Sequence, residues 1–326
     1  MKPRLHILHT QRQNHIPLVD SPSVRERFGV TVGEAMLGHA DLVWTQAYTN
    51  VRILQRMWDW GGPYIMQVGG DIWGEMGENS SRVGRILEGM RKAKAVVCVS
   101  EFLADLYRSR FGKGNFIALP GGLWGTDHCE KGVNPKRFTP KDDWDAKGKI
   151  RIVMSINITS REKWRGVPYF LQSIGASERY RIRYKMKITC SGRKKNHASI
   201  VKDWMKRYPF FKYKWLGSEW PNLLRNCDIF VHPSFFDGWP RAVAEAMCVG
   251  LPVVAYDVAG VSAVSKDIFL CDPKEPEQMI SILSDLMEDS FFREKVGRMR
   301  REEALKKTEK HRGDYVKILT QVLEES

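Results

Sequence analysis

Residues 231–254 decide the fold, and they read VHPSFFDGWPRAVAEAMCVGLPVV. An apolar strand runs to His232, a loop containing Gly238 follows, and a helical pattern begins near Pro240. Pro is favoured at the first helical position because its missing N–H would have no partner there. A second apolar strand starts at Pro252, so the segment predicts a strand, a loop, a helix and a parallel strand.

The same alternation of short apolar strands and helical patterns extends over the chain. Strand-like runs are Leu5–Leu8, Asp41–Thr45, Tyr64–Val68, Ala95–Val99, Asn115–Leu119, Ile150–Ile156, Tyr184–Cys190, Lys212–Leu216, Ile229–His232, Pro252–Tyr256 and Ile268–Leu270. Helical patterns separate them, and Ser100 is placed as the N-cap of one that spans Phe102–Phe111. This order predicts an α/β fold of two Rossmann-like, doubly wound lobes that face a cleft.

The chain length and one irregular stretch set the predicted domain boundaries. At about 150 residues per domain, 326 residues correspond to two domains. Periodicity is lost from Pro120 to Lys149, where Gly, Pro and Asp accumulate, which is typical of a linker. We therefore expect a first lobe at residues 1–147, a second at 148–308 and a terminal helix at 309–326.

Composition excludes several classes of protein. Hydrophobic residues make up 43% and charged residues 28%, which are globular proportions. No apolar run reaches the roughly 18 residues of a membrane-spanning helix, and the start lacks the pattern of a signal peptide, so a cytoplasmic location is expected. The six cysteines are spread singly, without zinc spacing, which predicts buried free thiols.

The net charge of +14 comes from one part of the chain. Residues 148–218 hold 18 basic and only 3 acidic side chains. Within them, residues 181–188 alternate basic and apolar, which predicts an exposed or edge strand, or a strand that continues from a basic loop. A surplus of this kind favours a polyanionic partner (nucleic acid, an anionic membrane or a phosphorylated substrate), although a solvated basic face is the alternative.

The loop before the helix has the chemistry of a diphosphate and sugar site. Backbone N–H groups at a loop and helix start bind anions, and the helix dipole adds to the attraction. Glu245, about one turn into the helix, can accept hydrogen bonds from sugar hydroxyls. Asp237 precedes Gly238 on the side where a ligand would extend.

The segment resembles the retaining glycosyltransferases of the group 1, or family 4, class, which have the GT-B architecture. Their signature, Pro-Ser-x-x-Glu-Gly-x-Pro-x-x-x-x-Glu-Ala-Met followed by Gly-x-Pro-Val-Val, is matched almost throughout, with Asp237 in place of the first Glu. The resemblance also covers the Leu216-Gly217-Ser218 turn, the Ser100-Glu101-Phe102 helix start, the strand Asp228–Val231 and the stretch Gly132–Pro140. It extends over most of residues 41–323.

The resemblance implies roles for individual residues. Glu245 would bind the nucleotide ribose and Asp237 the donor sugar. The loop of Gly238, Trp239 and Pro240 would receive the diphosphate and the sugar, and the Gly217-Ser218 turn belongs to the same donor site.

Further implied roles concern cations and the first lobe. The family places an Arg and a Lys after the first strand of the second lobe to neutralise the leaving diphosphate. Here Arg165 stands at the Lys position, and Arg161 or Lys163 supplies the other charge. The family's His-Gly motif appears as Gly69-Gly70-Asp71, so Asp71 is the candidate to take part of the role of that His.

The implied reaction moves a sugar from a UDP-, GDP- or ADP-sugar to a hydroxyl of a glycan or lipid-linked acceptor, with retention of configuration. It needs no cofactor and no metal. Asp143-Trp144-Asp145 matches an Asp-x-Asp metal pattern of another glycosyltransferase fold, but no strand leads into it. GT-B enzymes return their last helix to the first lobe, so we expect the stripe of Tyr315, Ile318, Leu319, Val322 and Leu323 to pack there.

Two other functions remain open from the sequence. A nucleic-acid-binding protein would use the basic block and the 11 Trp residues, but it does not explain the segment from Asp237 to Glu245. A GT-B relative that epimerises nucleotide sugars needs no acceptor. The basic side chains around Arg179–Lys187 and Arg193–Lys195 exceed the need of one diphosphate, and we interpret them as a peripheral docking face for an anionic membrane or lipid-linked acceptor.

Overall fold

A computed structural model describes residues 2–8, 22–32, 37–45, 51–72, 81–112, 114–119, 133–141, 144, 150–155, 164–176, 187–191, 199–214, 217–306 and 309–325. The chain divides into two compact units. The first unit comprises residues 1–132 and 307–326, and the second comprises residues 133–306.

A parallel sheet of six strands forms the centre of the first unit, in the order β2-β1-β3-β4-β5-β6. Its strands are β1 Arg4–Leu8, β2 Gly29–Val32, β3 Leu42–Thr45, β4 Tyr64–Val68, β5 Ala95–Cys98 and β6 Phe116–Ala118. Strand β2 was not predicted, because its four residues have too little apolar periodicity to be separated from a loop.

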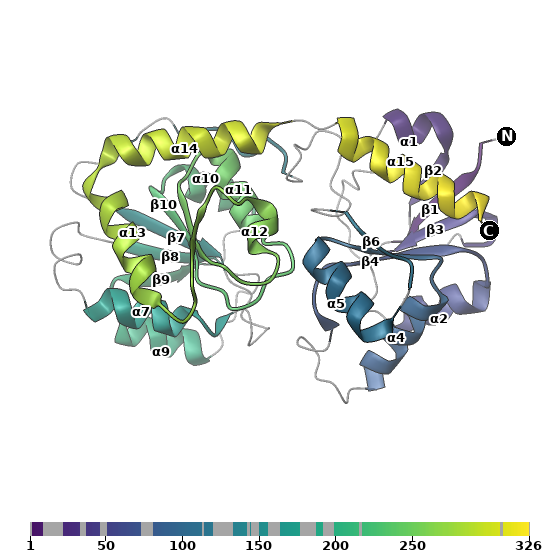
Figure 1. The fold of residues 1–326 in the computed structure, drawn as a ribbon, viewed down its shortest axis with the longest axis horizontal. Coiled ribbons are helices and arrows are strands. Elements are labelled where there is room, and N and C mark those ends of the chain that lie inside the picture. Colours follow the sequence, from purple (N-terminus) through teal and green to yellow (C-terminus); the bar gives the residue numbers. More distant parts are fainter. Residues whose placement is uncertain are drawn as a thin grey trace. The chain divides into compact units, whose positions relative to one another are not determined.

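Helices cover both faces of the first sheet (Figure 1). They are α1 Pro22–Arg27, η1 Leu37–His39, α2 Val51–Trp60, α4 Ser81–Lys92, α5 Glu101–Phe111 and α15 Glu309–Glu324. Helices α2, α4 and α5 lie on one side, and α1 and α15 lie on the other. The predicted N-cap is confirmed, since the Ser100 hydroxyl accepts a hydrogen bond from the Leu103 N–H at 3.3 Å.

The C-terminal helix α15 belongs to the first unit although it follows the second in sequence. Its apolar stripe packs against the first sheet, where Leu319 and Val322 join a buried cluster with Leu5 and Trp44. Burial of this stripe stabilises the helix far more than its intrinsic propensity does.

The second unit has another parallel six-stranded sheet, in the order β12-β11-β10-β7-β8-β9. Its strands are β7 Arg151–Ser155, β8 Lys187–Ser191, β9 Phe211–Lys214, β10 Ile229–His232, β11 Val253–Tyr256 and β12 Phe269–Cys271. Successive strands run outward from β7 on one side and from β10 on the other. The strand order therefore reverses between β7 and β10, which is the point where open α/β sheets bind ligands.

Of the alternatives predicted for residues 181–188, an edge strand does not apply to β8, which includes only residues 187 and 188 of that run. Strand β8 pairs with β7 on one side and with β9 on the other, because Phe211–Lys214 supplies the edge strand. Residues 181–186, which precede β8 in the basic run, lie outside the described residues.

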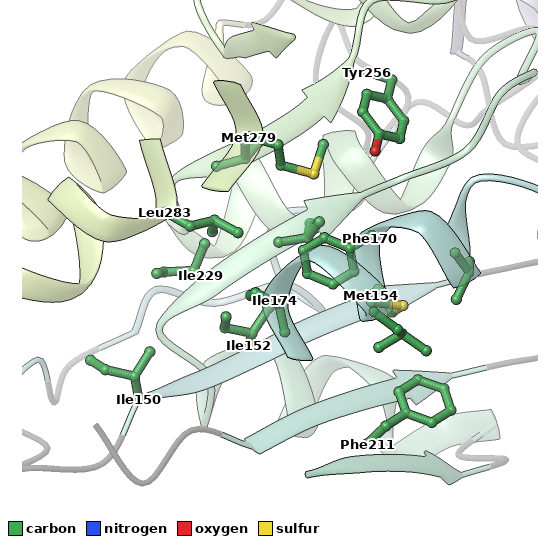
Figure 2. Packing of buried hydrophobic residues seen from close by; sticks show 14 of the residues in the cluster. Ile150, Ile152, Met154, Phe170, Ile174, Phe211, Ile229, Tyr256, Met279 and Leu283 are labelled. Carbon is green, nitrogen blue, oxygen red and sulfur yellow. The ribbon is translucent and has the colours of Figure 1, made fainter. Parts of the chain in front are cut away.

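The helices of the second unit cover both faces of its sheet (Figure 1). They are α7 Val167–Ala176, α9 Ser199–Arg207, η2 Gly217–Glu219, α10 Trp220–Arg225, α11 Arg241–Val249, α12 Val261–Val264, α13 Pro276–Glu288 and α14 Ser290–Leu305. On one face, Phe170 and Ile174 of α7 and Leu283 of α13 meet strand residues such as Ile152 and Ile229 (Figure 2).

The second unit begins at residue 133 rather than at 148. Lys141 is buried, and its ammonium lies 3.3 Å from the Asp228 carboxylate. The Lys141 N–H donates to the Val249 carbonyl, and Arg301 donates to the Phe138 carbonyl at 3.2 Å. These contacts fasten the segment around Phe138 and Lys141, within the expected linker, to the second unit, which local composition could not reveal.

The cysteine prediction is confirmed where the chain is described. Cys98, Cys227, Cys248 and Cys271 are buried free thiols. Burial raises the pKa of Cys98 and of Cys227 to about 12, so both stay protonated and unreactive at neutral pH. No helix in the described parts of the chain combines the length and apolar character needed to cross a membrane.

Candidate functional site

The candidate site lies in the second unit, where strands β7 and β10 end side by side. Strand β10 leads directly into the loop of residues 233–240, and the turn at Arg165 and Gly166 precedes α7. Both segments leave the carboxyl end of the sheet at the reversal of strand order. The predicted cation Arg165 and the predicted donor loop are therefore brought together by topology.

Gly166 shows how closely these two segments approach each other. A Cβ atom at Gly166 would lie 2.1 Å from the Pro233 carbonyl oxygen and 3.0 Å from the Phe235 ring. Only glycine fits there, because a methyl group would displace backbone. The Arg165 guanidinium lies 5.6 Å from the centre of the Phe235 ring, within the range of a cation–π interaction.

Phe235 has further aromatic neighbours that fix its position. Its ring lies 5.8 Å from that of Tyr169 and 5.5 Å from that of Tyr256. Burial raises the pKa of Tyr256 to about 12, so its hydroxyl is neutral over the physiological range. This aromatic cluster supports Arg165 at the carboxyl end of the sheet.

Asp237 is held within the donor loop by its own neighbours. One carboxylate oxygen accepts a hydrogen bond from the Trp239 N–H at 3.3 Å, which closes an Asx-type turn. The other lies 3.8 Å from Nε2 of His232, a buried residue at the end of β10. The contacts orient Asp237, and its side chain keeps some exposure to solvent.

The loop is also held from the next strand, through Gly260. The Gly260 N–H donates to the Asp237 carbonyl at 2.8 Å. A Cβ at Gly260 would lie 1.9 Å from the Gly238 carbonyl oxygen, so the two glycine backbones are packed directly against each other. The path of the predicted diphosphate loop thus depends on a turn that follows β11.

Helix α11 begins immediately after this loop. Pro240 is its N-cap rather than its first residue, and no side chain caps the helix start. Gly250, with a φ of 92°, ends the helix in the left-handed conformation that glycine adopts most readily. The helix is almost entirely buried, which gives its start a fixed position and direction.

Glu245 is the most constrained of the predicted site residues. It is only 9% exposed, although it carries a carboxylate. Its Oε2 accepts a hydrogen bond from Nε1 of Trp220 at 2.7 Å, and its Oε1 lies 3.6 Å from the Arg241 guanidinium. A mostly buried carboxylate is stable only with such partners.

The other predicted residues fall into three groups. Gly217 and Ser218 lie in η2, which Trp220 follows directly. Trp220 is the residue that donates a hydrogen bond to Glu245. Asp71 belongs to the first unit, where it follows β4. Arg161 and Lys163 lie outside the described residues, as do Arg179–Tyr184 and Arg193–Lys195.

Sequence reasoning missed residues that shape the site through packing. Trp220, Phe235 and Gly260 gave no periodic signal for such a role, because their partners are distant in sequence. His232 contacts the nearby Asp237, but its position at the end of an apolar strand did not reveal that contact. The one available signal was the position of Gly260 in a turn directly after an apolar strand. Among the described residues, no group of His, Cys, Asp and Glu side chains is arranged to hold a metal ion.

Solved structures show which fold the chain has. Two solved structures with the GT-B fold illustrate the likeness. The structure of Anabaena HepE, described as a complex with UDP and glucose, has a TM-score of 0.73 at 14% identity and covers 98% of this chain and 99% of its own. TarM has a TM-score of 0.66 at 13% identity, covering 86% of this chain and 54% of its own. The fold is GT-B.

A family model matches most of the second unit. Residues 150–289 match the family described as "Glycosyl transferases group 1". The match agrees with the resemblance stated above, and the matched residues include the whole predicted donor loop and Glu245.

Curated proteins are similar in sequence to this chain over shorter stretches. An Escherichia coli protein named UDP-Gal:alpha-D-GlcNAc-diphosphoundecaprenol alpha-1,3-galactosyltransferase is 33% identical over 75 residues, 22% of this chain and 19% of its own. A Campylobacter jejuni N,N'-diacetylbacillosaminyl-diphospho-undecaprenol alpha-1,3-N-acetylgalactosaminyltransferase is 36% identical over 86 residues, 26% of this chain and 23% of its own. The matched stretches thus span about a fifth of these relatives.

Proposed function

We propose that the protein is a retaining glycosyltransferase that moves a sugar from a nucleotide diphosphate to a hydroxyl acceptor without a metal ion. The observation that carries the proposal is the arrangement at the carboxyl end of β10. There a tightly packed glycine loop leads into a helix without a side-chain cap, and the mostly buried Glu245 lies on that helix. This geometry suits a diphosphate beside a ribose.

The names of the relatives support the class of donor and acceptor. The Escherichia coli name specifies UDP-Gal, and HepE is described with UDP and glucose, which favours a UDP-sugar over a GDP- or ADP-sugar. Both relatives' names specify alpha-1,3 linkages, the outcome that retention gives from an α-linked nucleotide sugar. Both also specify a diphosphoundecaprenol-linked sugar, which supports a lipid-linked glycan as acceptor.

In the proposed reaction the protein positions the reactants and stabilises the leaving group. Arg165, held over Phe235, would neutralise charge that develops on the departing diphosphate, together with Arg161 or Lys163. The leaving phosphate would assist deprotonation of the acceptor hydroxyl on the same face of the sugar, so no protein nucleophile is required. Asp237 would orient the donor sugar, and Glu245 would hold the ribose.

The decisive experiment measures turnover of UDP-glucose and UDP-galactose with a polyprenyl-diphosphate-linked sugar as acceptor. We expect UDP release that persists in EDTA and an α-linked product by NMR. Glu245→Ala should lower turnover at least about 100-fold, whereas Glu302→Ala, at an exposed position of α14, should not change it. Undiminished turnover in Glu245→Ala would refute the assignment, and free epimerised nucleotide sugar would favour an epimerase instead.

The acceptor class leads us to propose peripheral contact with an anionic membrane. The docking face interpreted from the sequence, Arg179–Lys187 and Arg193–Lys195, lies almost entirely outside the described residues. Described residues that support the proposal lie on α2 and α4, which contact each other in the first unit. These helices carry exposed basic residues, namely Arg52, Arg56, Arg82, Arg85, Arg91 and Lys92. Vesicles containing phosphatidylglycerol should retain the protein at low salt and release it at high salt, and failure to bind them would exclude the contact.

A further inference from the structure

Glu245 was predicted as a site residue, but its hydrogen-bond partner Trp220 was not. The indole Nε1 of Trp220 donates to the Glu245 carboxylate at 2.7 Å, across 25 residues of sequence. A hydrogen bond to an ionised acceptor is roughly twice as strong as one between neutral groups. The interaction therefore restrains a side chain on which the proposed nucleotide site depends.

Packing fixes the Trp220 ring independently of this hydrogen bond. The ring meets that of Phe230 edge to face, with 6.5 Å between centres and 72° between planes. Phe230 lies on β10 and is completely buried, so it is a rigid support. Trp220 also opens α10, where Pro221 follows and fixes the start of the helix.

The position of Trp220 in the chain links two parts of the candidate site. It directly follows η2, which contains Gly217 and Ser218, and its side chain reaches α11. A phenylalanine at this position could pack on Phe230, but only a side chain with a suitably placed hydrogen-bond donor can also hold the carboxylate. The hydrogen bond to the Glu245 carboxylate thus explains why Trp occupies this position.

We propose that Trp220 is a positioning residue, which fixes the carboxylate of Glu245 in the orientation that binds the hydroxyl groups of the nucleotide ribose. Arg241, at 3.6 Å from the other carboxylate oxygen, adds a weaker restraint from the same helix. A carboxylate offers about four acceptor sites, so the hydrogen bond from Trp220 does not prevent it from accepting from a ligand. The inference rests on the proposed function, because it takes Glu245 to be the ribose ligand.

The test is a double-mutant cycle on nucleotide affinity, with UDP as the probe and isothermal titration calorimetry as the measurement. Trp220→Phe keeps the packing on Phe230 and deletes the N–H, and it should raise the Kd for UDP about tenfold. In a Glu245→Ala background there is no carboxylate to position, so Trp220→Phe should then change the Kd less than about twofold. Trp204→Phe, on the buried face of α9, is the matched control and should leave the Kd unchanged.

Each alternative role for Trp220 gives a different result. A purely structural Trp220 would lower the melting temperature in Trp220→Phe but leave the Kd for UDP as in the wild type, which would overturn the inference. A Trp220 that touches the nucleotide directly would change the Kd in the Glu245→Ala background too, and this would also overturn it. Should Trp220→Phe fold poorly, Trp220→His supplies an N–H on a smaller ring, and affinity no better than that of Trp220→Ala would count against positioning.

The same measurements distinguish failure of the proposed function from failure of the proposed role of Trp220. If the wild-type protein binds none of UDP, GDP and ADP, the proposed function fails. If it binds UDP and Trp220→Phe binds it equally well, only the role of Trp220 fails.

Discussion

Both units contain an Asp–Arg ion pair at the same place in their sheets, but the two pairs differ in their surroundings. In the first unit, Asp41 precedes β3 and accepts hydrogen bonds from the backbone and guanidinium of Arg4, which begins β1. In the second unit, Asp228 precedes β10 and accepts from the backbone and guanidinium of Arg151, which begins β7. Each pair joins the amino ends of two neighbouring central strands.

Burial distinguishes the two pairs. The Asp41 side chain is 41% exposed, whereas that of Asp228 is 1% exposed and has a third partner in the buried Lys141. Charges in water interact weakly, and buried charges depend strongly on their partners. We therefore expect the pair to contribute little to stability in the first unit, whereas in the second unit Asp228 also neutralises the buried Lys141.

The opposite ends of the sheets differ as well. Helix α5 of the first unit starts with its N–H groups capped by Ser100, whereas helix α11 of the second starts at Pro240 without a side-chain cap. A capped helix start is satisfied by its own chain, and an uncapped start can bind an anion. The uncapped start of α11 is therefore consistent with a donor site at this helix.

The largest expected effect tests the burial of the acid–base pairs. Asp228→Ala leaves the Lys141 ammonium buried without its carboxylate and should lower the free energy of unfolding of the second unit by about 3–5 kcal/mol. Asp41→Ala is the matched control in the first unit and should cause a much smaller loss. Urea denaturation measures both, and equal losses would mean that burial does not distinguish the pairs.

The second prediction concerns glycine packing at the donor loop. Gly260→Ala places a methyl group on the Gly238 carbonyl, so we expect a loss of about 1–3 kcal/mol in stability together with a large loss of nucleotide binding. Gly84→Ala, in helix α4 of the first unit with open space around it, should instead stabilise by up to about 1 kcal/mol. Thermal unfolding and UDP titration of both variants provide the comparison, and unchanged UDP binding in Gly260→Ala would contradict it.

The third prediction concerns the capped helix start. Ser100→Ala removes the hydrogen bond to the Leu103 N–H and should lower stability by about 1 kcal/mol. Ser100→Asp, which keeps a capping oxygen, should restore most of that loss. If Ser100→Ala is as stable as the wild type, the Ser100 cap contributes nothing to stability.

The smallest effect is a dependence on pH in the first unit. Hydrogen bonds from Arg4 lower the pKa of Asp41 in the folded protein. The stabilisation is therefore present above the ordinary Asp pKa of about 3.9, and it is lost as the pH falls through the lower folded value. The stability difference between wild type and Asp41→Asn should shrink between pH 6 and pH 3, and a constant difference would contradict the ion pair.

Much of the fold was predictable because it depends on local patterns. The apolar runs at Tyr64–Val68 and Ile229–His232 match β4 and β10 to the residue, and Ser100 marks the start of α5. Strand β2 and helix α1 were not predicted, since short elements carry too little periodicity to be recognised without their neighbours. The interior position of β8 depends on pairing with β9, which no local pattern records.

The local structure of the predicted donor segment was predictable for the same reason. Asp237, Gly238, Pro240 and Glu245 lie within nine residues, so one strand, one loop and one helix place them together. The contacts that hold them come from elsewhere: Gly166 before α7, Trp220 at the start of α10, and Gly260 after β11. Each is brought in by a different strand crossover.

The sequence by itself determined the alternating α/β pattern, the donor segment and the charge that favours an anionic ligand, because all of these are written in neighbouring residues. Only the tertiary structure decided that Asp228 is buried with Lys141, that Gly260 supports the loop at Gly238, and that Trp220 holds Glu245. The physical reason is that burial and hydrogen bonding depend on distance in space, and the parallel order of β12-β11-β10-β7-β8-β9 brings together segments that are far apart along the chain.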